Sequence, residues 1–195
     1  MEKGLVNKSF MQLPHGVSEY LLVAHPGPTV YAQVMSEKQF FSAQFGQALA
    51  SKLKPHITVA DFVATEQMED TIIRWMHRVI SARKSFQVTL DRYGAFKPHT
   101  IYLNVQDPLP FQELAKELKA VDQFIQGYGC PPMHLVSHAH LTIARKLDAI
   151  TYQHAVQHYA QQQFFASFPV QELILLKRRD QFDACKQVNI FRLRP

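Results

Sequence analysis

The chain has 195 residues, 47% of them hydrophobic and 19% charged, which fits one domain or two closely joined lobes and excludes a disordered chain. The formal net charge of +5 suits an anionic ligand, but the only compact basic run is 177–179, which argues against a protein that coats nucleic acid. No apolar run reaches the ~18 residues that span a bilayer, and residues 1–10 lack the apolar stretch of a signal peptide. With two isolated cysteines, Cys130 and Cys185, we expect a cytoplasmic protein with reduced thiols and no membrane partner.

Residues 18–97 are expected to form the first of two similar halves, after an N-terminal extension at 1–17. Apolar runs and alternating patterns predict strands at residues 20–24, 55–60 and 86–96. Two helices are predicted between these strands. A capping box formed by Ser36 and Gln39 opens the first helix, and Thr65 caps the second.

Residues 98–195 repeat this order of elements and add one strand at the end. Their strands are predicted at residues 101–105, 139–144, 170–176 and 188–193. One helix is predicted from Asp107 to Ile125, and another begins after the capping residue Asp148. We therefore predict an α+β fold, with residues 1–195 forming a single bilobal domain. Each lobe is expected to be an antiparallel or mixed sheet with two flanking helices, and the second strand of each half is expected to face a central groove.

A six-residue pattern occurs in both halves, at 55–60 (Pro-His-Ile-Thr-Val-Ala) and at 139–144 (Ala-His-Leu-Thr-Ile-Ala). One His-x-Thr triplet would mean little in a chain with 10 histidines, but two copies in matching apolar surroundings are not expected by chance. Because side chains alternate between the two faces of a strand, His56 and Thr58 share one face. The same holds for His140 and Thr142, while the aliphatic residues between them point toward a core.

Two imidazoles and two hydroxyls brought to one site are suited to acid–base chemistry on a phosphate. An imidazole with its ordinary pKa near 6.5 accepts or donates a proton at neutral pH, so one can activate the attacking water or hydroxyl while the other protonates the leaving oxygen. The hydroxyls of Thr58 and Thr142 can donate hydrogen bonds to non-bridging phosphate oxygens. His56 and His140 are therefore the candidate catalytic pair, and this chemistry needs neither a metal nor a cofactor.

Four further residues are candidates for the same site. Lys54 and His138 stand two residues before the motif histidines on the same face, where each either adds positive charge at the phosphate or lies at the solvated rim. Arg145 follows the second motif, although alternation in a regular strand puts it on the opposite face. Tyr102 either stacks on a base or packs in the core. His15, His25 and His134 carry no pattern, and the i, i+4 pair His154 and His158 is interpreted as part of a solvated helix face.

The paired His-apolar-Thr-apolar motifs and the duplicated strand–helix order resemble the 2H phosphoesterase superfamily. Within it, the chain is most similar to the bacterial 2′–5′ RNA ligase-like and 2′,3′-cyclic phosphodiesterase group, over residues 20–193. The resemblance implies a bilobal fold with a groove between the lobes, a catalytic pair of His56 and His140, and phosphate binding by Thr58 and Thr142. It also implies that His56 is the general acid and that His140 is the base that activates water. The implied reaction opens a 2′,3′-cyclic phosphate and leaves a 2′-phosphate.

We therefore expect a metal-independent cyclic phosphodiesterase whose partner is an RNA end or a cyclic nucleotide, with no obligate protein partner. Two other enzyme activities stay open, a 2′–5′ RNA ligase and a phosphodiesterase for another metabolite. A further interpretation is an RNA-binding module without turnover. Turnover that depends on both motif histidines distinguishes the enzymes from the binding module.

Overall fold

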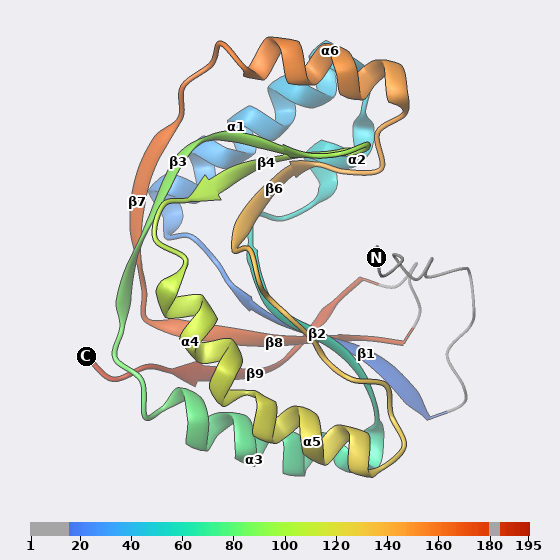
Figure 1. Cartoon of the computed structure of the whole chain (residues 1–195), viewed down its shortest axis with the longest axis vertical. Helices are drawn as coiled ribbons and strands as arrows, with labels where there is room; N and C mark the ends of the chain where they lie inside the picture. Colours follow the sequence, from blue (N-terminus) through green and yellow to red (C-terminus); the bar gives the residue numbers. More distant parts are fainter. Residues whose placement is uncertain (1–15, 180–183) are drawn as a thin grey trace, which may run out of the picture.

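The computed structural model describes residues 16–179 and 184–195, which form one curled sheet with helices at both ends (Figure 1). Its strands are β1 (Val17–Ala24), β2 (Ile57–Thr65), β3 (Phe86–Phe96), β4 (Thr100–Val105), β5 (His134–Leu135), β6 (His140–Ala144), β7 (Phe165–Val170), β8 (Glu172–Arg178) and β9 (Lys186–Arg192). Its helices are α1 (Pro28–Phe45), α2 (Ala48–Lys52), α3 (Glu69–Ile80), α4 (Leu109–Glu117), α5 (Lys119–Gly127) and α6 (Ala149–Tyr159), and a single 3-10 turn, η1 (Glu66–Met68), precedes α3. Most of the expected N-terminal extension lies outside the described residues.

The sheet runs in the order β7-β3-β4-β6-β2-β1-β8-β9, and β5 adds a short pairing to β2. Every pairing between these strands is antiparallel. The predicted α+β class and the antiparallel pairing are confirmed. The two ends of the molecule share one continuous sheet that curls between them (Figure 1).

Each end of the sheet is covered by helices from both halves of the sequence (Figure 1). At one end, α1 contacts β6 and β7, α2 contacts β6, and α6 contacts β4. At the other end, α3 contacts β9 and α5, while α4 contacts β2. Because α1 comes from the first half yet packs on β6, and α4 comes from the second half yet packs on β2, the halves are interwoven.

The central strands bury one face and leave the other open. Ile57 and Val59 on β2, and Leu141 and Ile143 on β6, are 0% exposed and belong to the hydrophobic core. The residues between them are only partly buried. We call the side of the sheet that carries these partly buried residues the open face. The alternation predicted from the motif is therefore present in both strands.

The start of α1 corrects one prediction. The helix begins at Pro28, with Gly27 as its N-cap, rather than at Ser36. Proline is favoured in the first helical turn because its missing N–H needs no partner there. Ser36 lies inside the helix on its exposed side, so the apparent capping box is a coincidence of spacing.

Two other boundaries differ from the prediction. Residues 170–176 belong to two strands, β7 and β8, which meet at Gln171. Pro169 is the reason that the sequence pattern does not predict β7, because proline is rare inside strands. However, β7 is an edge strand, and proline is tolerated there because one side of the strand forms no hydrogen bonds to a neighbouring strand. The helix predicted from Asp107 to Ile125 is divided at Leu118 into α4 and α5.

Candidate active site

The two motif strands are neighbours in the sheet. Ile57 of β2 pairs with Leu141 of β6. In an antiparallel pair this register sets His56 opposite Thr142, and Thr58 opposite His140, with Cβ atoms roughly 4.5–5.5 Å apart for directly facing residues. The structure thus brings the four motif side chains together on the open face.

Both motif histidines are held in the same way by the backbone. The Nδ1 atom of His56 lies 2.8 Å from the carbonyl oxygen of Lys54, and that of His140 lies 2.8 Å from the carbonyl oxygen of His138. A carbonyl oxygen only accepts hydrogen bonds, so each Nδ1 carries the proton and donates it. In the neutral ring, Nε2 is then left with its lone pair for a ligand.

The surroundings of both imidazoles favour their neutral forms. Burial lowers the pKa of His56 to about 4, the hydrogen bond to Lys54 opposes this shift, and electrostatic interactions with His25, Lys38 and Arg145 add to it. Burial likewise lowers the pKa of His140, the hydrogen bond to the carbonyl oxygen of His138 opposes this shift, and the electrostatic effect of the His138 ring adds to it. In the free protein at neutral pH, both rings are therefore neutral.

An aromatic wall encloses His140. Its ring centre lies 4.9 Å from that of Phe96 and 5.0 Å from that of Tyr102, and these two aromatic rings stack at 4.2 Å. Tyr102 reaches this place because Gly94 faces it across the β3–β4 pair and leaves room for its ring. The wall restricts the orientation of the His140 imidazole.

A buried lysine lies beside the motif strands. Lys38 of α1 is 1% exposed, and its ammonium group donates a hydrogen bond of 3.2 Å to the carbonyl oxygen of Ile143. Strand β2 begins at Ile57, so the end of β6 at Ile143 extends beyond β2. Lys38 supplies a hydrogen-bond donor to the carbonyl oxygen of Ile143 at this end of the strand. Burial, assisted by the charge of Arg145, lowers the pKa of Lys38 to about 8.

The four lesser candidates take different places. Lys54 and His138 are exposed and contact the motif histidines through their carbonyl oxygens, and the His138 ring also packs against Phe96 and Tyr102. Arg145 follows the end of β6 at Ala144, so the alternation of a regular strand no longer fixes its direction, and its charge acts on His56. Tyr102 is largely buried in the wall next to His140.

Sequence reasoning missed His25 as a neighbour of the site. Its ring centre lies 6.2 Å from that of His56, and its Nδ1 atom lies 2.7 Å from the carbonyl oxygen of Pro55. His25 follows β1, whose last residue, Ala24, pairs with Ile57. Only that pairing, which no pattern along the chain reveals, would have indicated its position.

The described parts of the chain hold no group of three or more His, Cys, Asp or Glu side chains placed to bind a metal ion. None of the helices in residues 16–179 and 184–195 is long and apolar enough to cross a membrane.

Comparison with known proteins identifies the family of this chain. The family model of the 2′-5′ RNA ligase superfamily matches residues 26–181. No protein of curated function matches the sequence. Among solved structures, Escherichia coli LigT complexed with 3′-AMP has 17% sequence identity and a TM-score of 0.63, covering 92% of this chain and 99% of LigT.

Two other solved structures share the fold. The protein TT0787 of Thermus thermophilus has 16% identity and a TM-score of 0.67, covering 90% of this chain and 98% of its own. A crystal structure described as a phosphoesterase has 14% identity and a TM-score of 0.61, covering 91% of this chain and 99% of its own. With the family model spanning most of the sequence and this fold around the paired motifs, the chain belongs to the 2′-5′ RNA ligase superfamily of 2H phosphoesterases.

Proposed function

We propose that the protein is a phosphoesterase that opens 2′,3′-cyclic phosphates of RNA ends or nucleotides by acid–base catalysis with His56 and His140, without a metal. The observation that carries the proposal is the matched presentation of the two imidazoles. Each has its Nδ1 proton bound to the backbone and its Nε2 left for a ligand, on adjacent strands of one open face.

In the proposed reaction, one histidine accepts a proton and the other donates one. The Nε2 atom of one ring takes a proton from water as the water oxygen bonds to phosphorus. The bond from phosphorus to the 3′ oxygen breaks, and the other ring, protonated, gives its proton to that oxygen. The product is a 2′-phosphate with a free 3′ hydroxyl.

The hydroxyls of Thr58 and Thr142 are proposed to donate hydrogen bonds to the non-bridging oxygens during this step. Each faces a motif histidine across the β2–β6 pair, so a phosphate between the rings is within reach of both. Placed donors of this kind contribute a factor of roughly 10²–10³ in rate. Replacing either threonine with valine, which keeps the shape, is expected to lower kcat by that order.

The free protein holds both rings neutral, so the acid must gain its proton together with the substrate. A bound phosphodiester anion next to an imidazole favours the protonated ring and raises its pKa. We assign His56 as the acid and His140 as the base, as the family resemblance implies. The reaction then begins once the bound anion has raised the pKa of His56, so that its ring carries the proton that the leaving oxygen receives.

Nucleotides are reasonable ligands for this site. Crystal structures of E. coli LigT are described as complexes with 3′-AMP, ATP and NADP⁺. For this chain, we propose a cyclic nucleotide or an RNA end as the substrate. Ligation of 2′–5′ RNA would use the same two histidines, with a 5′ hydroxyl instead of water giving up its proton as its oxygen bonds to phosphorus, and with the 3′ oxygen leaving and taking a proton as before.

Phosphorus NMR of the chelator-treated protein with a 2′,3′-cyclic mononucleotide tests the proposal. We expect ring opening by the wild type and a loss of roughly 10²-fold or more in His56→Ala and in His140→Ala. The chemical shift of the product shows whether the phosphate stays on the 2′ oxygen. Turnover that survives both substitutions would refute two-histidine catalysis. Nucleotide binding without turnover by the wild type would favour a binding module.

A further inference from the structure

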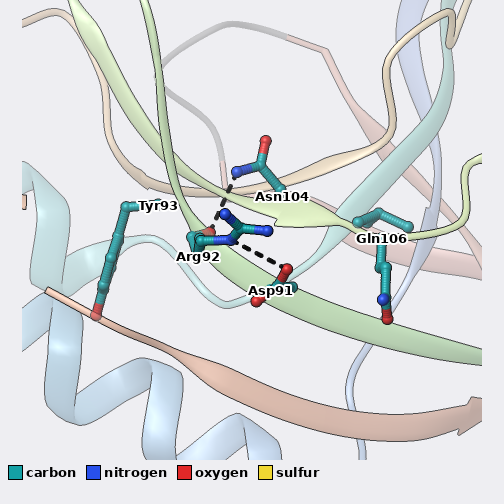
Figure 2. Close-up of a pocket in the computed structure, with 6 residues that line it drawn as sticks. Asp91, Arg92, Tyr93, Asn104 and Gln106 are labelled. Atoms are coloured by element: carbon teal, nitrogen blue, oxygen red, sulfur yellow. Dashed lines mark hydrogen bonds and ion pairs between the residues drawn. The ribbon is translucent and has the colours of Figure 1, made fainter. Parts of the chain in front are cut away.

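A polar pocket of about 420 Å³ lies on the sheet between strands β3 and β4 (Figure 2). It is lined by Asp91, Arg92, Tyr93, Asn104, Val105 and Gln106. In Figure 2, the side chains of Asp91, Arg92 and Asn104 lie close together, whereas the ring of Tyr93 points away from them. The Tyr93 hydroxyl instead donates a hydrogen bond to Glu37 of α1.

A bulge in β3 builds this pocket. Leu90 pairs with Val105 and Tyr93 pairs with Leu103, so Asp91 and Arg92 together stand opposite Asn104. Arg92 adopts a φ of 60°, in the left-handed region that non-glycine residues seldom occupy. Such a conformation persists only where neighbouring groups hold it, and it is concentrated at functional sites.

Hydrogen bonds hold the backbone of the bulge on both sides. The N–H of Arg92 donates to the carbonyl oxygen of Phe164 at 2.9 Å, and Nδ2 of Asn104 donates to the carbonyl oxygen of Arg92 at 3.3 Å. The Arg92 side chain, however, is 75% exposed, and its Nε atom lies 3.2 Å from Oδ2 of Asp91. The bulge thus presents a guanidinium group beside a carboxylate.

The pocket lies next to the candidate active site in the sheet. Asn104 pairs with His140 in the β4–β6 register, so the two side chains share the open face in directly facing positions. Gln106 lies two residues further along the same strand. From β6 to the bulge of β3 there are two strand spacings, roughly 10 Å, which is comparable to the length of a nucleoside.

We propose that this pocket binds the nucleobase of the substrate whose cyclic phosphate lies at His56 and His140, an inference that rests on the proposed function. Arg92 only donates hydrogen bonds, Asp91 only accepts them, and the amides of Asn104 and Gln106 do both. This mixed set complements the edge of a base, which carries donors and acceptors side by side. The carboxylate of Asp91 argues against a phosphate group at this position, because it would repel the anion.

Turnover of substrates with and without a base tests this assignment. The substrates are the four 2′,3′-cyclic mononucleotides and methyl ribofuranoside 2,3-cyclic phosphate, which keeps the reacting group and lacks the base. The variants are Arg92→Gly, whose glycine adopts the observed φ without strain, and the isosteric Asp91→Asn. Arg78→Ala removes an exposed arginine from α3, at the other end of the sheet, and serves as the matched control.

For both pocket variants we expect kcat/KM to fall by roughly 10-fold for the preferred nucleotides and to change little for the base-free substrate. Differences among the four bases should also shrink, whereas Arg78→Ala should resemble the wild type. An equal loss on the base-free substrate, or no loss on any nucleotide, would overturn the base assignment while leaving the proposed function intact.

Binding separates this inference from a failure of the proposed function. If the wild type opens none of the cyclic phosphates, the affinity of a nucleoside 2′-monophosphate for wild type and Arg92→Gly is measured by titration calorimetry. A Kd that rises by roughly 10-fold in the variant supports the base pocket even without turnover. An unchanged Kd, or no binding to the wild type, refutes it.

Discussion

At the scale of single residues, the local backbone sets the chemistry of the two motif histidines. Each donates its Nδ1 proton to the carbonyl oxygen of the residue two positions earlier, so the tautomer is fixed within three consecutive residues of the chain. Burial then keeps both rings neutral in the absence of a ligand. In the free protein, Nε2 of each ring is therefore unprotonated and is the atom that can accept a proton.

The lowered pKa of His56 predicts a loss of stability in acid. The unfolded chain protonates His56 near pH 6.5, whereas the folded protein does so only near pH 4, so the unfolded state binds more protons between these values. The free energy of unfolding should fall across this window by up to about 3 kcal/mol from this residue alone. Urea denaturation of wild type and His56→Asn at about pH 7 and about pH 4.5 measures the contribution. We expect a smaller loss in the variant, and equal losses would contradict the lowered pKa.

A sulfur leaving group distinguishes the acid from the base. When sulfur replaces the 3′ oxygen of the cyclic phosphate, it departs as a thiolate and needs little help from an acid, since an ordinary thiol has a pKa of about 8.5. The defect of His56→Ala should then shrink by roughly 10-fold or more, while the defect of His140→Ala should stay large. Rates of both variants on the oxygen and sulfur substrates provide the measurement. Rescue of His140→Ala instead would reverse the two roles.

At the scale of elements, the β3–β4 pair determines how His140 is oriented. Gly94 stands opposite Tyr102, and a Cβ atom at residue 94 would lie 2.6 Å from two atoms of the Tyr102 ring. That ring contacts His140 and stacks on Phe96, so it cannot move without disturbing the wall. The absence of one side chain on β3 thus positions an imidazole on β6, two strands away.

Gly94→Ala is expected to lower both stability and activity. The added methyl group displaces Tyr102, which should cost about 1–3 kcal/mol of unfolding free energy and reduce kcat by roughly 10-fold as His140 loses its orientation. Gly127→Ala is the matched control, because a Cβ atom there meets nothing within 4 Å. Thermal unfolding and turnover on a cyclic mononucleotide measure the two effects. An effect no larger than that of the control would show that Tyr102 does not position His140.

The sequence could predict the place of a residue only where the neighbours that determine this place lie close to it along the chain. The common face of His56 and Thr58 follows from alternation within one strand, and Asp148 caps α6 as its sequence context predicts. The position of His25 depends instead on the β1–β2 pairing, and that of Asn104 on the β4–β6 pairing. Lys38 is buried among the apolar residues on the inner side of α1, at a position where the helical pattern predicts an apolar residue. These positions are set by long-range contacts that no single segment encodes.

At the scale of the whole molecule, the interwoven halves argue for one cooperative unit. Strands from both halves of the sequence are interleaved in the continuous sheet, where β3 lies between β7 and β4, and the pair β2–β1 lies between β6 and β8. Helices α1 and α4 pack on strands of the opposite half. Each half therefore lacks some of the partners on which its strands and helices pack. We therefore propose that the chain unfolds as a single domain, despite its two helical ends.

The single tryptophan tests this cooperativity. Trp75 lies on α3 and stacks on Phe124 of α5, so its fluorescence reports the end of the molecule that holds these helices. Phe41 is fully buried on α1 at the opposite end, where its truncation in Phe41→Ala should cost about 3–5 kcal/mol. If the chain is one unit, the urea midpoint followed at Trp75 should shift as far as the midpoint followed by far-UV circular dichroism. If the two ends unfold independently, Trp75 should keep its wild-type midpoint while the circular dichroism transition separates into two steps. The two motif strands lie between these ends, so the first result would also mean that damage at either end is transmitted to the paired histidines.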